Sequence, residues 1–117
     1  MKLLPSVDKV VIPIEKLTAY SLNPDKDYNK ATAFKLALGY DLTNADRLKE
    51  NIFRNISMFE SIGKGRNGFG EVYECVINLE GENGKRANIL TSWIIEDGTD
   101  FPKLTNVYVT NKKVRKK

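Results

Sequence analysis

The fold of this chain is decided by FGEVYECVINLEGENGKRANILTSWII, residues 69–95. Apolar and polar residues alternate along both halves of this stretch, which is the period of a β-strand with one buried face. Asn83-Gly84 stands between the halves and is typical of a tight hairpin turn. The stretch therefore predicts two long antiparallel strands, whose shared faces carry Tyr73, Cys75, Ile77, Leu79, Ile89, Thr91, Trp93 and Ile95.

Two shorter strands are expected to flank this hairpin. KLTNVYV, residues 103–109, follows the turn sequence EDGTDFP, and SMFESIGK, residues 57–64, leads into the glycine-rich stretch GKGRNGFG. That stretch lacks the GxxxxGK[ST] spacing of a phosphate-binding loop and the GxGxxG spacing of a dinucleotide site, so we interpret it as a hairpin loop. Its Lys64 and Arg66 are still candidate contacts to a backbone phosphate. The second half of the chain thus predicts a four-stranded antiparallel meander.

The first half of the chain predicts three helices. Proline and glycine bound the first two, at 14–20 and 30–38. The third opens at Thr43 or Asn44 and places apolar residues at helical spacing up to Ile56. The predicted fold class is α+β, with N-terminal helices packed on a C-terminal four-stranded meander. We expect Trp93 and Leu48 to lie in the shared core.

The composition excludes several kinds of chemistry. The 117 residues include no histidine and one cysteine, Cys75. Histidine-based acid–base catalysis, zinc sites that need imidazole and an intrachain disulfide are therefore excluded, and neither a metal nor a cofactor is expected. No apolar stretch approaches the ~18–20 residues that span a bilayer, so no membrane segment is predicted.

Length and charge indicate one domain with a basic tail. A chain of this length forms a single domain, which we place at residues 1–110. Residues 111–117, NKKVRKK, supply five positive charges and no negative ones. We expect this tail to be a flexible, solvated end, with a nucleic-acid anchor as the alternative. The net charge of +4 is compatible with a polyanionic partner.

Lys30 is an unusual residue for the first turn of a helix. The unpaired amides at a helix start carry about half a positive charge, so a cation there costs roughly 0.3–1 kcal/mol. Either the lysine is tolerated at a surface, or an anion binds beside it.

Two residues of the predicted hairpin allow more than one interpretation. Cys75 has no activating neighbour in the sequence, which favours a small core residue over a nucleophile. Thr91 is either a strand residue whose hydroxyl finds a local hydrogen-bond partner, or a polar position on a sheet surface that binds substrate.

Four segments of the chain are distinctive: IPIEKLTAYSLNP (12–24), NKATAFKLALGYD (29–41), GFGEVYECVINLEGENGKRANILTSWII (68–95) and KLTNVYVT (103–110). Through these segments, residues 4–109 resemble an uncharacterised domain family found at the C-termini of bacterial polymorphic toxins and of phage minor head proteins. The resemblance covers about nine-tenths of the chain. The order of helices followed by a meander is also similar to that of the barnase, EndoU and colicin group of metal-independent ribonuclease toxins.

The resemblance implies an antibacterial effector domain that cleaves transfer RNA without a metal. Such cleavage needs a group that takes the proton of the 2′-hydroxyl, a cation that stabilises the phosphorane and a proton donor for the leaving oxygen. Lys30, at a helix N-terminus, suits the phosphate. The candidate catalytic residues are Lys30, Tyr20, Thr91, Thr105 and Tyr108, with Tyr73 as a further proton-transfer candidate. The candidate substrate-binding residues are Lys16, Asn23, Lys64 and Arg66.

The implied partners are RNA, a cognate immunity protein and elongation factor Tu. The implied place of action is the cytoplasm of a target bacterium, after delivery as part of a larger secreted or phage protein. A non-enzymatic binding module is the alternative, and it would dock a translation factor, a phage capsid component or an immunity protein. The lack of histidine leaves the identity of the general base open.

Overall fold

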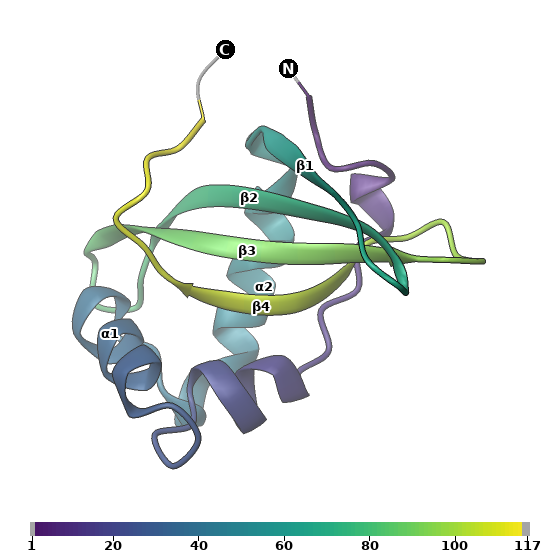
Figure 1. Cartoon of the computed structure of the whole chain (residues 1–117). Helices are drawn as coiled ribbons and strands as arrows, with labels where there is room; N and C mark the ends of the chain where they lie inside the picture. Colours follow the sequence, from purple (N-terminus) through teal and green to yellow (C-terminus); the bar gives the residue numbers. More distant parts are fainter. Residues whose placement is uncertain (1, 116–117) are drawn as a thin grey trace.

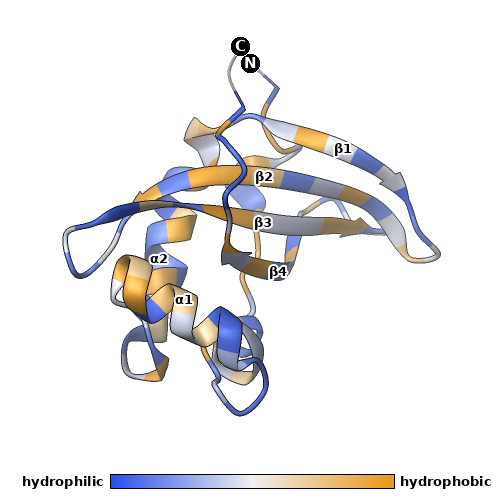
Figure 2. Cartoon of the chain, turned by 60° about the vertical axis from the view of Figure 1, so that its left-hand side comes forward, coloured by the Kyte–Doolittle hydropathy of each residue, from blue (hydrophilic) through white to orange (hydrophobic). Residues whose placement is uncertain are grey.

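Four antiparallel strands form one sheet in the order β1-β2-β3-β4, in a computed structural model that describes residues 2–115 (Figure 1). The helices precede the strands in sequence and lie on one face of the sheet (Figures 1 and 2). The expected α+β class, with N-terminal helices packed on a C-terminal meander, is confirmed. The strands are β1 Ser61–Arg66, β2 Gly70–Glu80, β3 Arg86–Glu96 and β4 Lys103–Val109.

Two α-helices and four short helical segments precede the sheet. The segment η2 is a turn of π-helix, in which the Leu22 N–H donates to the Leu17 carbonyl over 2.8 Å. Within the described residues, no helix is both long and apolar enough to cross a membrane. The helical elements are η1 Val7–Lys9, η2 Leu17–Ser21, α1 Tyr28–Leu38, η3 Leu42–Asn44, α2 Ala45–Asn55 and η4 Ile56–Met58.

The hairpin of β2 and β3 has the register that the alternating pattern predicts. Tyr73 lies opposite Trp93, and Cys75 lies opposite Thr91. The turn between the strands contains Gly84 at φ 80°, a backbone conformation that favours glycine. The Asn83-Gly84 pair therefore closes the hairpin because glycine adopts this positive φ without steric cost.

Helix α2 supplies much of the helical side of the core. Trp93 and Leu48 are both 0% exposed and belong to one cluster of buried residues, which confirms the expectation for the shared core. Burying one large apolar side chain contributes about 1.5–3 kcal/mol, so the α2 face is a major source of stability. Its buried apolar residues, continued into η4, are Ala45, Leu48, Ile52 and Ile56.

Helix α1 begins earlier than expected and ends where expected. Its first residue is Tyr28 rather than Lys30, because Asp27 is the N-cap and its Oδ1 accepts a hydrogen bond from the Lys30 N–H over 3.0 Å. The helix ends at Gly39, which has φ 76° as expected of a left-handed C-cap.

Strand β1 differs from the expectation at both ends. It begins at Ser61 rather than Ser57, because Ile56–Met58 prolongs α2 as a 3-10 turn. Much of the glycine-rich stretch then joins the sheet instead of forming a loop. Gly65 and Arg66 pair with β2, and a shift of register between Gly63 and Gly65 leaves Lys64 in a bulge.

The N-terminal half of the chain covers the outer edge of β4. The Leu104 N–H donates to the Val11 carbonyl over 2.9 Å. Farther along the strand, the Ser21 hydroxyl donates to the Val107 carbonyl over 2.6 Å. This cover removes an exposed edge that could pair with another chain. It also brings η2 against the middle of β4.

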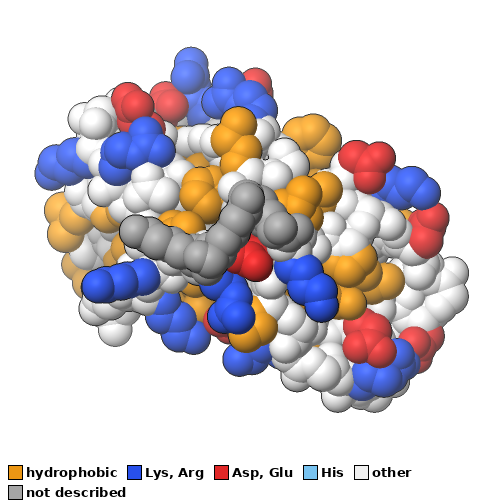
Figure 3. Space-filling model, turned by 90° about the horizontal axis from the view of Figure 1, so that it is seen from above, with side chains coloured by type: hydrophobic (Ala, Val, Ile, Leu, Met, Phe, Trp, Pro, Cys, Tyr) orange, Lys and Arg blue, Asp and Glu red, His pale blue; other side chains and the backbone are white. Residues whose placement is uncertain are grey.

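The described part of the basic tail crosses the helix-free face of the sheet (Figure 2). Asn88 Nδ2 donates to the Lys112 carbonyl over 3.1 Å, and Lys112 Nζ lies 3.2 Å from Glu74 Oε1. Figure 3 shows Lys and Arg side chains spread over the face seen from above, with Asp and Glu side chains between them. A purely solvated end does not account for these contacts. The part of that expectation that concerns residues 116–117 lies outside the described residues.

Candidate nucleic-acid interface

Lys30 joins the first turn of α1 to the edge strand β4. Its Nζ donates to Asn106 Oδ1 over 2.9 Å. The same atom lies 5.4 Å from the centre of the Tyr108 ring, within the range of a cation–π contact. Asn106 and Tyr108 share one side of the strand, because alternate residues of a strand face the same way. The Lys30 side chain is thus half-buried and held at the sheet edge.

Tyr20 carries two further lysines over its ring. The Nζ atoms of Lys16 and Lys26 lie 5.6 and 5.5 Å from the ring centre. The tyrosine is 46% exposed, so its ring is accessible from solvent. An accessible ring with two cations beside it can bind both a base and a phosphate.

Two hydrogen bonds attach the segment that carries Tyr20 and the side chain of Lys30 to neighbouring residues of β4. Ser21 follows Tyr20 in the chain and bonds to Val107, whereas Lys30 bonds to the preceding residue, Asn106. Figure 1 shows η2 and α1 on the side of the sheet where β4 forms the edge. The residues that meet there, called the lysine–tyrosine cluster below, are Lys16, Tyr20, Lys26, Lys30, Asn106 and Tyr108.

The lysines of this cluster form no ion pair with an acidic residue within 2–115. The acids that follow Tyr20 most closely in the chain are Asp25 and Asp27, and an oxygen of Asp27 is engaged by the backbone of α1. The three ammonium groups therefore remain available to a polyanion. The basic residues that do form ion pairs are Lys9, Lys35, Arg47, Arg66, Arg86, Lys103 and Lys112.

The structure explains why a lysine is tolerated in the first turn of α1. Asp27 provides the acidic cap that a helix start favours, and the Lys30 side chain extends away to β4. An incoming anion is therefore not needed to account for the position. At the same edge of the sheet, Lys16 is also half-buried and Lys26 is exposed.

Thr91 lies in the core and not on a substrate-binding surface. It is 0% exposed. Its hydroxyl donates to the Cys75 carbonyl over 2.7 Å and accepts the Trp93 Nε1–H over 2.8 Å. The interpretation of Thr91 as a catalytic residue is therefore wrong, because the residue is not accessible to solvent and its hydroxyl accepts the hydrogen bond of Trp93. A local hydrogen-bond partner, the other interpretation, is what the structure shows.

Replacing Thr91 with valine is expected to lower the free energy of unfolding by about 1–3 kcal/mol, since the buried Trp93 N–H loses its acceptor. RNA binding by the folded variant is expected to stay unchanged. Urea denaturation and fluorescence anisotropy with labelled RNA measure the two effects. Loss of RNA binding without loss of stability would contradict this prediction and would indicate that Thr91 belongs to the RNA-binding site.

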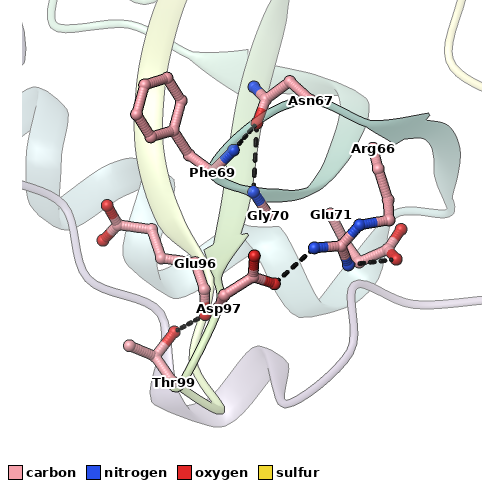
Figure 4. Close-up of polar contacts among 8 residues, drawn as sticks. All are labelled: Arg66, Asn67, Phe69, Gly70, Glu71, Glu96, Asp97 and Thr99. Carbon is pink, nitrogen blue, oxygen red and sulfur yellow. Dashed lines mark hydrogen bonds and ion pairs between the residues drawn. The ribbon is translucent and has the colours of Figure 1, made fainter.

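Lys64 and Arg66 lie away from the lysine–tyrosine cluster. Figure 1 shows the tip of the β1–β2 hairpin and α1 at opposite ends of the sheet. The Arg66 guanidinium lies between Glu71, at 2.9 Å, and Asp97 (Figure 4). Two carboxylates therefore neutralise Arg66, and this pairing raises the pKa of its guanidinium. The exposed Lys64 does not join the cluster.

The remaining candidates from the sequence are Asn23, Tyr73 and Thr105. Asn23 shapes the loop before α1, since its Nδ2 donates to the Thr18 carbonyl and its Oδ1 accepts the Asp25 N–H. Tyr73 packs against the core on the helix-covered face. Thr105 is exposed and precedes Asn106 in β4, where its hydroxyl donates to the Ser92 carbonyl over 3.2 Å. Thr105 therefore adjoins the cluster next to Asn106, and Asn23 adjoins it through backbone hydrogen bonds with Tyr20 and Lys26.

Cys75 is a core residue, as its strand position indicates. Burial raises the pKa of its thiol to about 12. The thiol is therefore protonated at neutral pH, and we expect a thiol-specific reagent to modify the native protein only as fast as the protein opens. Modification kinetics with and without urea test this expectation. Rapid modification of the native protein would contradict it.

Two members of the cluster could not be found by sequence reasoning. Lys26 follows Tyr20 by six residues, a spacing that belongs to no helix face, and the loop around Pro24 brings it back. In the sequence, Asn106 is one polar residue of an alternating strand, and only the packing of α1 against β4 shows its contact with Lys30. Both depend on tertiary packing, and a local pattern carries no signal for either.

The comparisons with known proteins assign this chain to a family and do not add a function. No curated protein and no solved structure matches the chain. The family described as a domain of unknown function, DUF6883, matches residues 3–111, which is nearly the whole sequence. This chain therefore belongs to the DUF6883 family.

Proposed function

We propose that this domain binds single-stranded RNA through the lysine–tyrosine cluster and cleaves it without a metal. The observation that carries the proposal is that three lysines, which form no ion pair within residues 2–115, lie against two tyrosine rings at one edge of the sheet. Basic side chains that track phosphates, together with aromatic rings on which bases stack, are the usual components of single-strand binding.

Binding magnitudes favour a base over a lysine on the Tyr20 ring. A stacked base contributes about 1–3 kcal/mol. An exposed cation–π contact contributes about 0.5–1 kcal/mol. A base can therefore displace Lys16 or Lys26 from the ring, and the displaced ammonium can then bind the adjoining phosphate.

Cleavage by the 2′-hydroxyl would use Lys30 together with the hydroxyl groups of the cluster and of Thr105. The Lys30 ammonium would stabilise the charge that develops on the phosphorane. Tyr20 and Tyr108 would transfer the protons to and from the reacting oxygens, and the exposed Thr105 hydroxyl would orient the scissile group. Hydroxyls and an ammonium suffice for these roles, so the proposal needs neither histidine nor a metal ion.

The biological setting is proposed from the resemblance of residues 4–109 to the C-terminal domains of bacterial toxins and phage head proteins. In that setting the substrate is transfer RNA. The partners are a cognate immunity protein and elongation factor Tu, and the domain acts in the cytoplasm of a target bacterium after delivery by a larger protein. An inhibitor of this domain is expected to carry acidic groups that complement the cluster.

The test is incubation of the domain with total RNA, with and without EDTA. We expect transfer RNA to be cleaved in both conditions. A variant with Lys16, Lys26 and Lys30 all replaced by glutamine is expected to lose the activity. Replacing Lys2, Lys49 and Lys85 removes the same charge at positions that form no ion pair within the described residues, so this control variant should remain active.

A non-enzymatic binding module is the second candidate. The observation that favours it is a mainly apolar hollow of about 390 Å³ between α1 and η3. Leu36 and Leu42 line the hollow and are 69% and 45% exposed. A translation factor, a phage capsid component or an immunity protein would dock there. Intact RNA after incubation, together with normal RNA binding, would favour this candidate.

Deletion of residues 111–117 is expected to weaken the salt dependence of RNA binding. The segment carries five basic residues. A single-stranded contact contributes a slope of about 0.7 in log affinity against log salt, so the slope should fall by no more than about three to four units. Binding isotherms at several salt concentrations measure it. An unchanged slope would show that the tail does not contact RNA.

A further inference from the structure

A second site is indicated by a polar hollow of about 360 Å³ between α2 and the turn after β2. It shares no residue with the lysine–tyrosine cluster and does not depend on the proposed ribonuclease activity. Its volume is within the range of small-molecule sites. The residues that line it, called the Tyr40 hollow below, are Tyr40, Arg47, Glu50, Asn51, Arg54, Glu80, Gly81 and Glu82.

The orientation of Asn51 leaves the Tyr40 hydroxyl with an unused proton. Asn51 Nδ2 lies 2.8 Å from Tyr40 Oη and 2.9 Å from the Glu80 carbonyl oxygen. A carbonyl can only accept, so the group facing it must be the NH₂ of the amide. The tyrosine oxygen therefore accepts from Asn51, and its own O–H has no acceptor among the described residues.

This unused donor is deeply placed. Tyr40 is 1% exposed and Asn51 is 8% exposed. The oxygen of Tyr40 is satisfied by Asn51, but its O–H also needs an acceptor, so we expect an oxygen atom of water or of a ligand to occupy this part of the hollow. Burial also raises the pKa of Tyr40, which keeps the phenol protonated and able to donate at neutral pH.

Two arginines favour an oxyanion as that acceptor. Arg47 and Arg54 stand two turns apart on α2 and flank Asn51. Arg54 has no acidic partner within residues 2–115, and Arg47 contacts Glu82 through one nitrogen at 3.1 Å. Most of their N–H groups remain free, and a guanidinium matches a phosphate well.

The glutamates of the hollow restrict the ligand further. Glu50, Glu80 and Glu82 would repel a bare anion, but their carboxylates can accept hydrogen bonds from hydroxyl groups. A ligand that carries both a phosphate and hydroxyls satisfies the two sets of residues at once. We propose that the Tyr40 hollow binds a small phosphorylated polyol of the ribose phosphate class, with Tyr40, Arg47 and Arg54 on the phosphate and Glu50 and Glu82 on the hydroxyls.

The test is a titration of the ¹⁵N-labelled domain with ribose 5-phosphate, inorganic phosphate and ribose, each at millimolar concentration. We expect ribose 5-phosphate to shift the Asn51 side-chain NH₂ signals and the backbone amides of Gly81 and Glu82. It should bind about 10-fold more tightly than either fragment. Absence of shifts with ribose 5-phosphate, or equal affinity for inorganic phosphate, would overturn the proposal.

Variants separate this site from a general effect of charge. Tyr40→Phe removes the hydroxyl, and Arg54→Gln removes an exposed cation, so the second variant keeps the test valid if the first does not fold. Each is expected to weaken ribose 5-phosphate binding about 10-fold or more. Lys2→Gln removes the same charge at an exposed position that belongs to neither site and should leave the affinity unchanged. Unweakened binding by Arg54→Gln would contradict the assignment.

Discussion

Replacing Lys30 with alanine is expected to slow RNA cleavage about 100–1,000-fold, the usual effect of removing one preorganised contact to the transition state. The fold should survive. The variant loses a hydrogen bond to Asn106 and a cation–π contact with Tyr108, but it also removes a cation from the positive end of α1. These effects oppose each other, so the free energy of unfolding should change by no more than about 1 kcal/mol.

Cleavage rates and urea denaturation of the same preparation measure both parts of this prediction. Lys49→Ala is the matched control, because Lys49 has no ion pair within the described residues and lies on α2. Growth arrest of a sensitive cell provides a second readout. Undiminished arrest by Lys30→Ala would show that the Lys30 side chain only covers its apolar neighbours.

Replacing Trp93 with alanine is expected to lower the free energy of unfolding by about 3–5 kcal/mol, the range for truncating a large buried aromatic residue. Trp93 is 0% exposed and stands in register with Tyr73 on one side and Leu104 on the other. Truncation opens a cavity in the centre of the sheet and leaves the Thr91 hydroxyl without its donor. For a domain with a typical stability of about 5–15 kcal/mol, this variant is close to unfolding.

Chemical denaturation measures the loss, with Trp93→Phe as the comparison. Phenylalanine keeps much of the ring volume and removes the N–H, so its cost should be clearly smaller than that of alanine. A loss below about 1 kcal/mol for Trp93→Ala would mean that the side chain is not central to the core.

Much of the fold follows from local sequence patterns. The β2–β3 hairpin forms where alternation and Asn83-Gly84 agree, and β4 has the expected bounds 103–109. Helix α2 forms where its apolar residues recur every three to four positions. In these elements propensity, hydrophobic period and turn chemistry indicate the same structure, which is the condition under which sequence reasoning succeeds.

The candidate site was only partly predictable, because its contacts join distant segments. Lys30, Tyr20 and Tyr108 were candidates from the sequence, and the structure brings them to one edge. Thr91 was misassigned because alternation identifies the face of a strand but does not show that Trp93 donates to its hydroxyl. Arg66 was a candidate cation until its two acidic partners came together from β2 and from the turn after β3.

The most direct test of the central claim is to map RNA binding on the ¹⁵N-labelled domain at low salt with a short single-stranded RNA. If the lysine–tyrosine cluster is the interface, the largest chemical-shift changes will fall at residues 16–30 and 106–108, and they will disappear in the variant that lacks Lys16, Lys26 and Lys30. Changes that centre instead on residues 64–71, or persist in that variant, would contradict the account.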